Sequence, residues 1–328
     1  MGNASLKKIA VLTSGGDAPG MNAAIRAVVR TANYHKIECV GVRGGYTGLI
    51  EGNFTKMGPR SVSNIINLGG TILRSARSKE FRTEEGRQKA FEQCQKNGID
   101  ALVCIGGDGT FTGAKIFAEE FGVKVIGVPG TIDNDIYGTD FTIGYDTALN
   151  TAMEAIDKIR DTATSHNRVF FIEVMGRDAG FIALNSGIAS GALDILIPEK
   201  KDSLEDLFET FEKAQKRGKT SSIVIVAEGE RLASTYELAE QTKQRFPDYD
   251  IRVSILGHIQ RGGAPSCADR VLASRMGYGA VVGLLKGLTN VMAGIRSNDL
   301  VFTPIEDAIR KHNEINQDLL QIAEILAM

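Results

Sequence analysis

Two short turns of glycine and aspartate are the residues of this chain best suited to bind a charged ligand. The first turn reads SGGD at residues 14–17, and the second reads GGDGT at residues 106–110. Each follows an apolar run and precedes a helical pattern, and such a glycine-rich turn lets backbone N–H groups approach an anion closely. A carboxylate repels phosphate unless a hard cation such as Mg²⁺ lies between them. The two turns therefore predict a nucleotide or phosphate site with Asp108 as the ligand of Mg²⁺, and the alternative is two tight turns with solvated aspartates.

A hydroxyl and two carboxylates follow a third apolar run, at residues 129–135, which read PGTIDND. Transfer of a phosphoryl group to an alcohol requires positioning, neutralisation of charge and a base near the acceptor hydroxyl. Thr131 has a hydroxyl that would bind the transferring phosphate, and Asp133 has a carboxylate that would take the proton. The alternative for this segment is an acidic turn held by its own Asx hydrogen bonds.

Two further segments carry arginine beside glycine. Residues 174–180 read VMGRDAG, and residues 257–263 read GHIQRGG shortly after Arg252. Arginine binds a phosphate monoester with a fork of hydrogen bonds, and its charge stabilises negative charge that spreads in a transition state. These segments therefore predict a phosphate-binding and charge-stabilising role, whereas each of them alone would also fit a solvated arginine or a structural histidine.

Strand-like runs alternate with helical patterns along the chain, which predicts a parallel α/β fold. A helix is expected at residues 203–217, with Ser203 as its N-cap and Gly218 just past its end, and another between Thr83 and Gly98. Ligands bind beyond the carboxyl ends of the strands in such sheets, where both glycine-aspartate turns lie. The expected strands are residues 8–13, 37–42, 101–105, 124–128, 169–174, 194–197 and 222–227.

Composition narrows the class of protein. A chain of 328 residues is long enough for about two domains. The net charge of −2 and the lack of an apolar run near the roughly 20 residues that span a bilayer lead us to expect neither nucleic acid nor a membrane as partner. The four cysteines lack metal-ligand spacing, which favours a reduced cytoplasmic compartment, and the four histidines lack the HExxH pattern of zinc enzymes.

Taken together and in order, five segments resemble the motif set of the bacterial 6-phosphofructokinases. A GGDGT turn alone is also found in diacylglycerol and NAD kinases, whereas five ordered motifs over nearly the whole chain are specific. The resemblance implies two Rossmann-like domains with mostly parallel central sheets. The ATP-binding domain would be residues 1–143 plus about 259–309, and the fructose 6-phosphate-binding domain residues 144–258 plus about 310–328. The five segments are residues 14–22, 106–110, 129–135, 175–177 and 257–263.

The resemblance implies that ATP and fructose 6-phosphate are converted to ADP and fructose 1,6-bisphosphate, the committed step of glycolysis. Asp133 would be the base on the sugar 1-hydroxyl, with Thr131, Asp135 and Arg177 as the other catalytic residues. The residues implied for ATP are Gly16, Tyr46, Arg77, Ser78, Gly107, Asp108, Gly109 and Thr110, with Asp108 serving Mg²⁺. The residues implied for the sugar phosphate are Thr131, Asp133, Arg168, Met175, Gly176, Arg177, Glu228, Arg252, His258 and Arg261.

The resemblance also implies a homotetramer with shared active sites, in which Arg168 and Arg252 come from a neighbouring subunit. Leu193 stands where the family has an effector-site glutamate, and Pro59 where many relatives have a charged residue, so we expect weaker or different allosteric control. After the Met-Gly-Arg motif, Phe181 replaces an aspartate common in bacterial members. The residues implied for a nucleoside diphosphate or phosphoenolpyruvate effector are Arg26, Arg30, Arg160, Arg217 and Lys219.

Three alternative functions stay open at this point. A diphosphate-dependent phosphofructokinase would usually have aspartate at Gly109 and lysine at Gly130, and both positions are glycine here. An NAD or lipid kinase would account for residues 106–110 but would leave residues 129–135 and 257–263 unexplained. A catalytically silent regulatory subunit would be favoured by loss of Asp108 or Asp133, and the chain has both.

Overall fold

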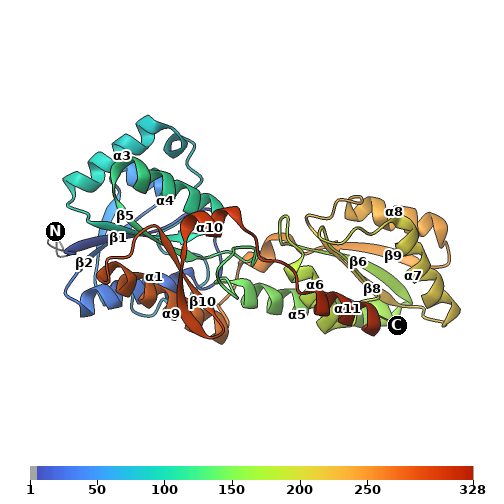
Figure 1. The fold of residues 1–328 in the computed structure, drawn as a ribbon. Helices are drawn as coiled ribbons and strands as arrows, with labels where there is room; N and C mark the ends of the chain where they lie inside the picture. Colours follow the sequence, from blue (N-terminus) through green and yellow to red (C-terminus); the bar gives the residue numbers. More distant parts are fainter. Residues whose placement is uncertain (1–5, 328) are drawn as a thin grey trace. The chain divides into compact units, whose positions relative to one another are not determined.

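The chain forms two units, each with its own β-sheet, in the computed structural model, which describes residues 6–327 (Figure 1). Each unit is built from more than one segment of the chain, because the last part of the sequence returns to the first unit and then to the second. Unit 1 comprises Met1–Ile132, Ile136–Thr147 and Arg261–Asn313, and unit 2 comprises Asp133–Asp135, Ala148–Gln260 and Glu314–Met328.

Unit 1 is built on a seven-stranded sheet in the order β11-β10-β5-β4-β1-β2-β3. The strands from β2 to β10 in this order run parallel, and β3 and β11 pair antiparallel at the two edges. Parallel strands need crossover helices on both faces, which is why the central strands are continuous apolar runs. The strands are β1 (Lys8–Thr13), β2 (Glu38–Val42), β3 (Phe54–Met57), β4 (Ala101–Gly106), β5 (Lys124–Pro129), β10 (Val291–Arg296) and β11 (Asp299–Pro304).

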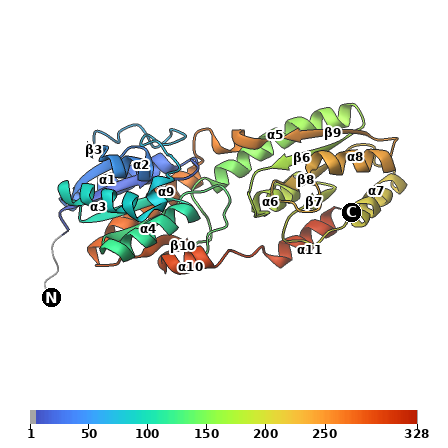
Figure 2. The ribbon, with the colours of Figure 1, turned by 90° about the horizontal axis from the view of Figure 1, so that it is seen from above.

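The helices of unit 1 cover both faces of this sheet (Figure 2). Helices α1 and α9 pack against each other on one face. The other face is covered by α2, α3, α4 and α10, whose side chains share one core with Leu12, Leu102 and Cys104 of the central strands. The helices are α1 (Met21–Tyr34), α2 (Gly45–Glu51), the 3₁₀ helix η1 (Glu80–Arg82), α3 (Glu84–Lys96), α4 (Asp108–Phe121), α9 (Cys267–Leu285) and α10 (Ile305–Arg310).

Unit 2 is built on a four-stranded parallel sheet in the order β7-β8-β6-β9. Helices α7 and α8 pack on one face through Leu207, Phe211 and Leu238, and α11 packs on α6. The strands are β6 (Arg168–Val174), β7 (Asp194–Leu196), β8 (Ser222–Ala227) and β9 (Asp250–Ile255). The helices are α5 (Tyr145–Ser165), which begins in unit 1, α6 (Phe181–Ser190), α7 (Leu204–Lys216), α8 (Thr235–Arg245), the 3₁₀ helix η2 (Gly257–Arg261), which ends in unit 1, and α11 (Gln317–Leu326).

The expected α/β fold is confirmed, and each of the seven predicted strands is present with its ends within one residue. Both predicted helices are also confirmed by their caps. Ser203 and Asp206 form a reciprocal capping box at the start of α7, and the hydroxyl of Thr83 accepts a hydrogen bond from Gly86 N at the start of α3. Gly218 takes a left-handed conformation, with φ of 73°, directly after the C-cap of α7.

Four strands were not predicted, namely β3, β9, β10 and β11. Strands β3, β9 and β11 lie at sheet edges, where one side of the strand stays near solvent and the sequence keeps polar and charged residues. Among the residues that the structure describes, no helix combines the length and the apolar character that crossing a membrane requires.

Candidate active site

The two glycine-aspartate turns lie side by side in unit 1. They follow β1 and β4, which pair parallel with Thr13 opposite Ile105. The hydroxyl of Thr110 donates to Ser14 O over 3.0 Å, and Ser14 N donates to Ile105 O over 3.0 Å. Gly15 takes a left-handed φ of 84°, and its carbonyl accepts from the Ser75 hydroxyl at 2.5 Å. The structure therefore joins the two turns at the carboxyl edge of the sheet, where parallel sheets bind ligands.

The second turn opens helix α4, whose first residue is Asp108. A β-carbon on Gly106 would lie 2.5 Å from Ser14 O, so that glycine serves the packing of the two turns. A β-carbon on Gly109 would meet no atom within 4 Å, so the backbone there borders open space. The first N–H groups of a helix have no intrahelical acceptor and carry partial positive charge. The start of α4 is therefore a surface on which phosphate oxygens would find both hydrogen-bond donors and favourable charge.

The segment after β5 lies beside this turn. Gly130 N donates to Gly106 O over 3.0 Å, and the Thr142 hydroxyl donates to Thr131 O over 2.7 Å. Asp133, two residues further along the chain, is 7% exposed. Residues 133–135 belong by their contacts to unit 2, so the segment that carries Thr131, Asp133 and Asp135 runs from one unit into the other.

The residues expected around the rest of the nucleotide lie in different environments within unit 1. Arg77 is exposed, and the hydroxyl of Ser78 accepts a hydrogen bond from Phe81 N over 3.2 Å. Tyr46 is 4% exposed and its ring stacks on that of Phe81 with centroids 4.0 Å apart. Its hydroxyl donates to Thr110 O at 2.5 Å, and burial raises its pKa well above the usual value. Tyr46 thus supports the second turn through Thr110, and its contact with the nucleotide stays a prediction.

Arg261 lies in unit 1 against the first turn. A β-carbon on Gly16 would collide with the Arg261 guanidinium and lie 3.1 Å from its Cζ. The Nε of Arg261 is buried and has no hydrogen-bond partner among residues 6–327. The sequence predicted Gly16 for ATP and Arg261 for the sugar phosphate, and the structure brings the two residues together.

The expected sugar-binding loop follows β6 in unit 2. Arg177 N donates to the Glu228 carboxylate over 3.2 Å, so Met175, Gly176, Arg177 and Glu228 lie together. Met175 N donates to the side-chain oxygen of Gln260 over 2.8 Å, and Gln260 is fully buried. Sequence reasoning did not single out Gln260. Its only signal in the sequence was its place in the segment 257–263, directly before the predicted site residue Arg261.

Two of the three arginines expected at the sugar phosphate, Arg168 and Arg252, share one carboxylate in unit 2. Arg168 Nε lies 2.7 Å from Asp250 Oδ2, and Arg252 Nη2 lies 3.0 Å from Asp250 Oδ1. The hydrogen bond from Arg168 and the charge of Arg252 hold the pKa of Asp250 below its usual value. Sequence reasoning missed Asp250, because its partner Arg168 is distant in the chain and stands opposite it only in the β6–β9 pairing. His258, also expected at this phosphate, is exposed on η2.

The residues expected at an effector pocket form one cationic group in each unit. In unit 2, burial and the charges of Arg160 and Arg217 lower the pKa of Lys219. In unit 1, burial and the charge of Arg30 lower the pKa of Arg26. Leu193, at the position of the family's glutamate, is 4% exposed, and its N–H donates to Ile223 O over 2.7 Å. Its side chain therefore belongs to the core of unit 2 and offers no metal ligand, and Pro59 is exposed without an N–H.

Among residues 6–327, no three His, Cys, Asp or Glu side chains gather in a cluster that would hold a metal by protein ligands alone. Mg²⁺ in nucleotide sites needs no such cluster, because it is usually bound by one or two carboxylates and by substrate phosphates. Asp108, partly exposed at the start of α4 beside the open space at Gly109, fits that pattern.

Comparisons with known proteins find phosphofructokinases that match nearly the whole chain. The phosphofructokinase family model matches residues 8–284. The chain is 57% identical to the ATP-dependent 6-phosphofructokinase of Cytophaga hutchinsonii, over 98% of both chains. It is 54% identical to the ATP-dependent 6-phosphofructokinase 1 of Thermus thermophilus, over 98% of this chain and 100% of that one.

Solved structures give the same fold. The phosphofructokinase of Saccharomyces cerevisiae matches with a TM-score of 0.88 and 38% identity, covering 93% of this chain and 45% of that chain. A pyrophosphate-dependent phosphofructokinase of Marinobacter aquaeolei matches with a TM-score of 0.83 at 22% identity, a likeness that shows the fold alone. The expected fold with two Rossmann-like domains is confirmed by these neighbours.

Proposed function

This chain belongs to the phosphofructokinase family, and we infer from that premise that it transfers the γ-phosphoryl group of ATP to the 1-hydroxyl of fructose 6-phosphate. The products are fructose 1,6-bisphosphate and ADP, and the reaction is the committed step of glycolysis. The observation that carries this function is the identity of 57% over 98% of both chains with a relative named ATP-dependent 6-phosphofructokinase.

The choice of ATP over diphosphate is supported by the open space at Gly109. A β-carbon there would meet no atom within 4 Å, so this position leaves room beside the phosphates for the remainder of ATP. Gly130 supports the choice less directly. A β-carbon there would lie 3.1 Å from Ile105 Cγ2 and 3.2 Å from Met21 Cε, so glycine at this position also serves the packing of the core.

We assign the proton transfer to Asp133. As the sugar 1-hydroxyl attacks the γ-phosphorus, its proton passes to the Asp133 carboxylate, while Thr131 and Asp135 help to orient the reacting groups. Arg177 stabilises the negative charge that spreads over the transferring phosphoryl group. The hydrogen bonds of the 175–177 loop to Glu228 and Gln260 support this assignment, because they fix the backbone from which Arg177 extends.

We propose that the N–H groups at the start of α4 bind the phosphates of ATP, together with Gly16, Arg77 and Ser78. Asp108 would hold Mg²⁺, which when bound neutralises phosphate charge that would otherwise oppose the attack. A single carboxylate beside a glycine-rich helix start supports this assignment, since the phosphates supply the remaining ligands.

We further propose a homotetramer in which Arg168 and Arg252 serve the active site of a neighbouring subunit. Arg252 lies on β9, which is at the edge of its sheet. Ile255 on the same strand and Ile259 on η2 are 46% and 57% exposed. An edge strand flanked by exposed apolar side chains is a surface suited to pairing with a second copy.

The cytoplasmic location expected from the cysteines stays a prediction.

The cationic residues of the two units are proposed to bind an anionic effector, with coupling weaker than in the familiar bacterial enzymes. Arg160, Arg217 and Lys219 would attract the phosphates, but the buried Leu193 removes a carboxylate that would ligate the accompanying metal. Saturation with fructose 6-phosphate, measured with and without ADP or phosphoenolpyruvate, tests this. Either compound should shift half-saturation by less than about tenfold, that is by less than about 1.4 kcal/mol of coupling.

The reaction is tested by coupling purified enzyme to aldolase and following product formation from fructose 6-phosphate. We expect turnover with ATP and Mg²⁺ and negligible turnover with diphosphate and Mg²⁺ at equal enzyme concentration. Comparable rates with diphosphate would contradict the choice of donor. No product with either donor, from enzyme that is folded by circular dichroism, would contradict the function.

A further inference from the structure

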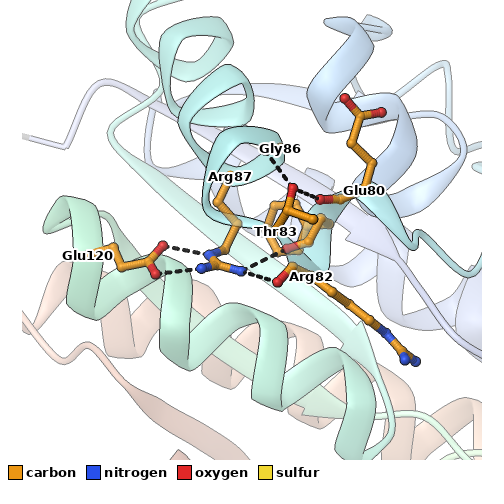
Figure 3. A network of polar contacts seen from close by, with 7 residues as sticks. Glu80, Arg82, Thr83, Gly86, Arg87 and Glu120 are labelled. Atoms are coloured by element: carbon orange, nitrogen blue, oxygen red, sulfur yellow. Dashed lines mark hydrogen bonds and ion pairs between the residues drawn. The ribbon is translucent and has the colours of Figure 1, made fainter.

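A bidentate ion pair joins helices α3 and α4 of unit 1, between the buried Arg87 and the exposed Glu120. Arg87 on α3 is 8% exposed, and its Nε and Nη2 lie 2.5 Å and 2.6 Å from the two carboxylate oxygens of Glu120 on α4 (Figure 3). Two parallel charge-assisted hydrogen bonds fix both distance and orientation, which a single contact does not. The pair therefore holds α3 at one place along α4, the helix that begins with the second glycine-aspartate turn.

The same guanidinium also holds the segment just before α3. Arg87 Nη1 donates to Phe81 O over 3.1 Å and to Arg82 O over 2.8 Å (Figure 3). The carbonyl of the preceding residue, Glu80, accepts from the Thr83 hydroxyl over 2.8 Å. Three consecutive carbonyl groups of η1 thus have acceptor roles in one network, and the backbone of η1 is fixed relative to α3 and α4.

From η1 the contacts lead to the second turn. The ring of Phe81 stacks on Tyr46 at 4.0 Å, and the Tyr46 hydroxyl donates to Thr110 O. Phe81 N donates to the Ser78 hydroxyl over 3.2 Å, which ties η1 to the loop that carries Arg77. The loop expected to hold ATP is therefore joined to α4 at two places, near its start through Tyr46 and near its end through Glu120.

We propose that Arg87 is a positioning residue for ATP, which acts through Glu120 and η1 to fix Arg77 and Ser78 relative to the turn at residues 107–110. The proposal rests on the proposed function, because Arg77 and Ser78 are nucleotide ligands only within it. Binding groups on two separate elements act together when both are held in place beforehand, and a displacement of about 1 Å can be costly. The hydrogen bonds of the Arg87 side chain go to Glu120, Phe81 and Arg82, all within unit 1, so we expect its effect to be restricted to the nucleotide.

Arg87→Lys is the first test. Lysine keeps the positive charge, but its single ammonium group cannot reproduce the fork toward Glu120 and reach two carbonyls as well. In the full-length enzyme, we expect the KM for ATP and the Kd of ATP, measured by calorimetry without sugar, to rise about tenfold. The KM for fructose 6-phosphate should stay within about twofold, because its expected ligands lie on other elements.

Two further variants make the result decisive. Lys89→Gln is the matched control, because it removes an exposed ion pair that also joins α3 to η1, Lys89 Nζ to Glu80 Oε1 at 2.7 Å, and should leave both constants unchanged. Glu120→Gln keeps the shape of Glu120 but removes its charge and one of the two oxygens that accept from Arg87. It should therefore also raise the KM and Kd for ATP, and it provides this test even if Arg87→Lys fails to fold.

A variant that unfolds at a lower temperature but binds ATP as the wild type does would show that the network is only structural and would overturn the proposal. An equal rise in the constants for ATP and fructose 6-phosphate would overturn it too. A wild-type enzyme that uses no ATP would instead contradict the proposed function, so the two failures are distinguishable.

Discussion

The guanidinium of Arg261 occupies the space in which a side chain on Gly16 would lie. A β-carbon on residue 16 would come within 3.1 Å of Arg261 Cζ and collide with the terminal nitrogen. A larger residue at this position would therefore displace the end of a side chain 245 residues away, in addition to any effect on a ligand. The contact links a residue expected at ATP to one expected at the sugar phosphate.

Gly16→Ala should displace the Arg261 guanidinium with little effect on folding, because the end of a flexible side chain can move. We expect kcat/KM to fall while the thermal unfolding temperature stays near the wild-type value. Arg261→Ala and the double variant complete the cycle. Since both changes remove the same contact, their effects on kcat/KM should be clearly less than additive. Fully additive effects would show that Gly16 and Arg261 act independently.

Gly109→Asp should separate donor binding from folding. Its side chain would enter open space at the start of α4, where a carboxylate favours the helix, so stability should be unchanged. The new charge beside the phosphates should lower kcat/KM for ATP by at least about tenfold, because like charges in contact cost several kcal/mol. Gly109→Ala is the matched control. Gly130→Lys is a poorer test, because its β-carbon would press on Ile105. If Gly109→Asp uses ATP as well as the wild type does, Gly109 does not lie beside the phosphates of ATP.

Shared active sites predict complementation between two inactive variants. Arg252→Ala removes a group that we assign to the neighbour's site, and Asp133→Asn removes the base from its own site. Hybrid oligomers of the two should regain part of the wild-type rate, because some sites then draw each intact group from a different chain. A wild-type monomer that is active by light scattering and assay, or hybrids verified by mass that stay inactive, would contradict shared sites.

Asp194 predicts a dependence of stability on pH. Burial raises the pKa of its carboxyl from 3.8 to about 6. Because the folded-state pKa is the higher one, stability contributed by the protonated form is fully present below pH 3.8 and is lost as the pH rises through about 6. Lys200 opposes this shift, and Asp202 and Asp206 add to it.

Asp194→Asn should therefore stabilise the enzyme at pH 8 by roughly 1–3 kcal/mol, and by less at pH 5. Urea unfolding at the two pH values measures this, and Glu205→Gln, an exposed carboxylate on α7, is the control. An equal gain at both pH values would show that Asp194 does not titrate in this range.

Local patterns in the sequence predicted much of the fold. The apolar runs of β1, β4 and β8 and the caps at Ser203 and Thr83 depend on neighbouring residues, so the sequence reports them directly. Strands β9 and β11 could not be found in this way, since at a sheet edge the alternation of apolar residues is incomplete.

The residues of the candidate site also fall into two groups, those that the sequence predicted and those that it did not. Glycines and carboxylates of the turns were recognisable because their spacing along the chain is itself the signal. Gln260 supports Met175, and Asp250 joins Arg168, across more than 80 residues. Glu120 meets Arg87 only because α3 and α4 lie together, with the ring of Phe91 stacked on that of Phe121. These supporting residues depend on tertiary contacts, which a single sequence does not record.

The kcat of Asp133→Asn with ATP and fructose 6-phosphate tests the central claim, that Asp133 takes the proton of the sugar hydroxyl. Asparagine keeps the size of this side chain, which is 7% exposed, so folding and the Kd of fructose 6-phosphate should be preserved. Loss of a general base should lower kcat by about 10²–10⁴. A folded variant that binds both substrates and keeps a kcat near the wild-type value would contradict the claim.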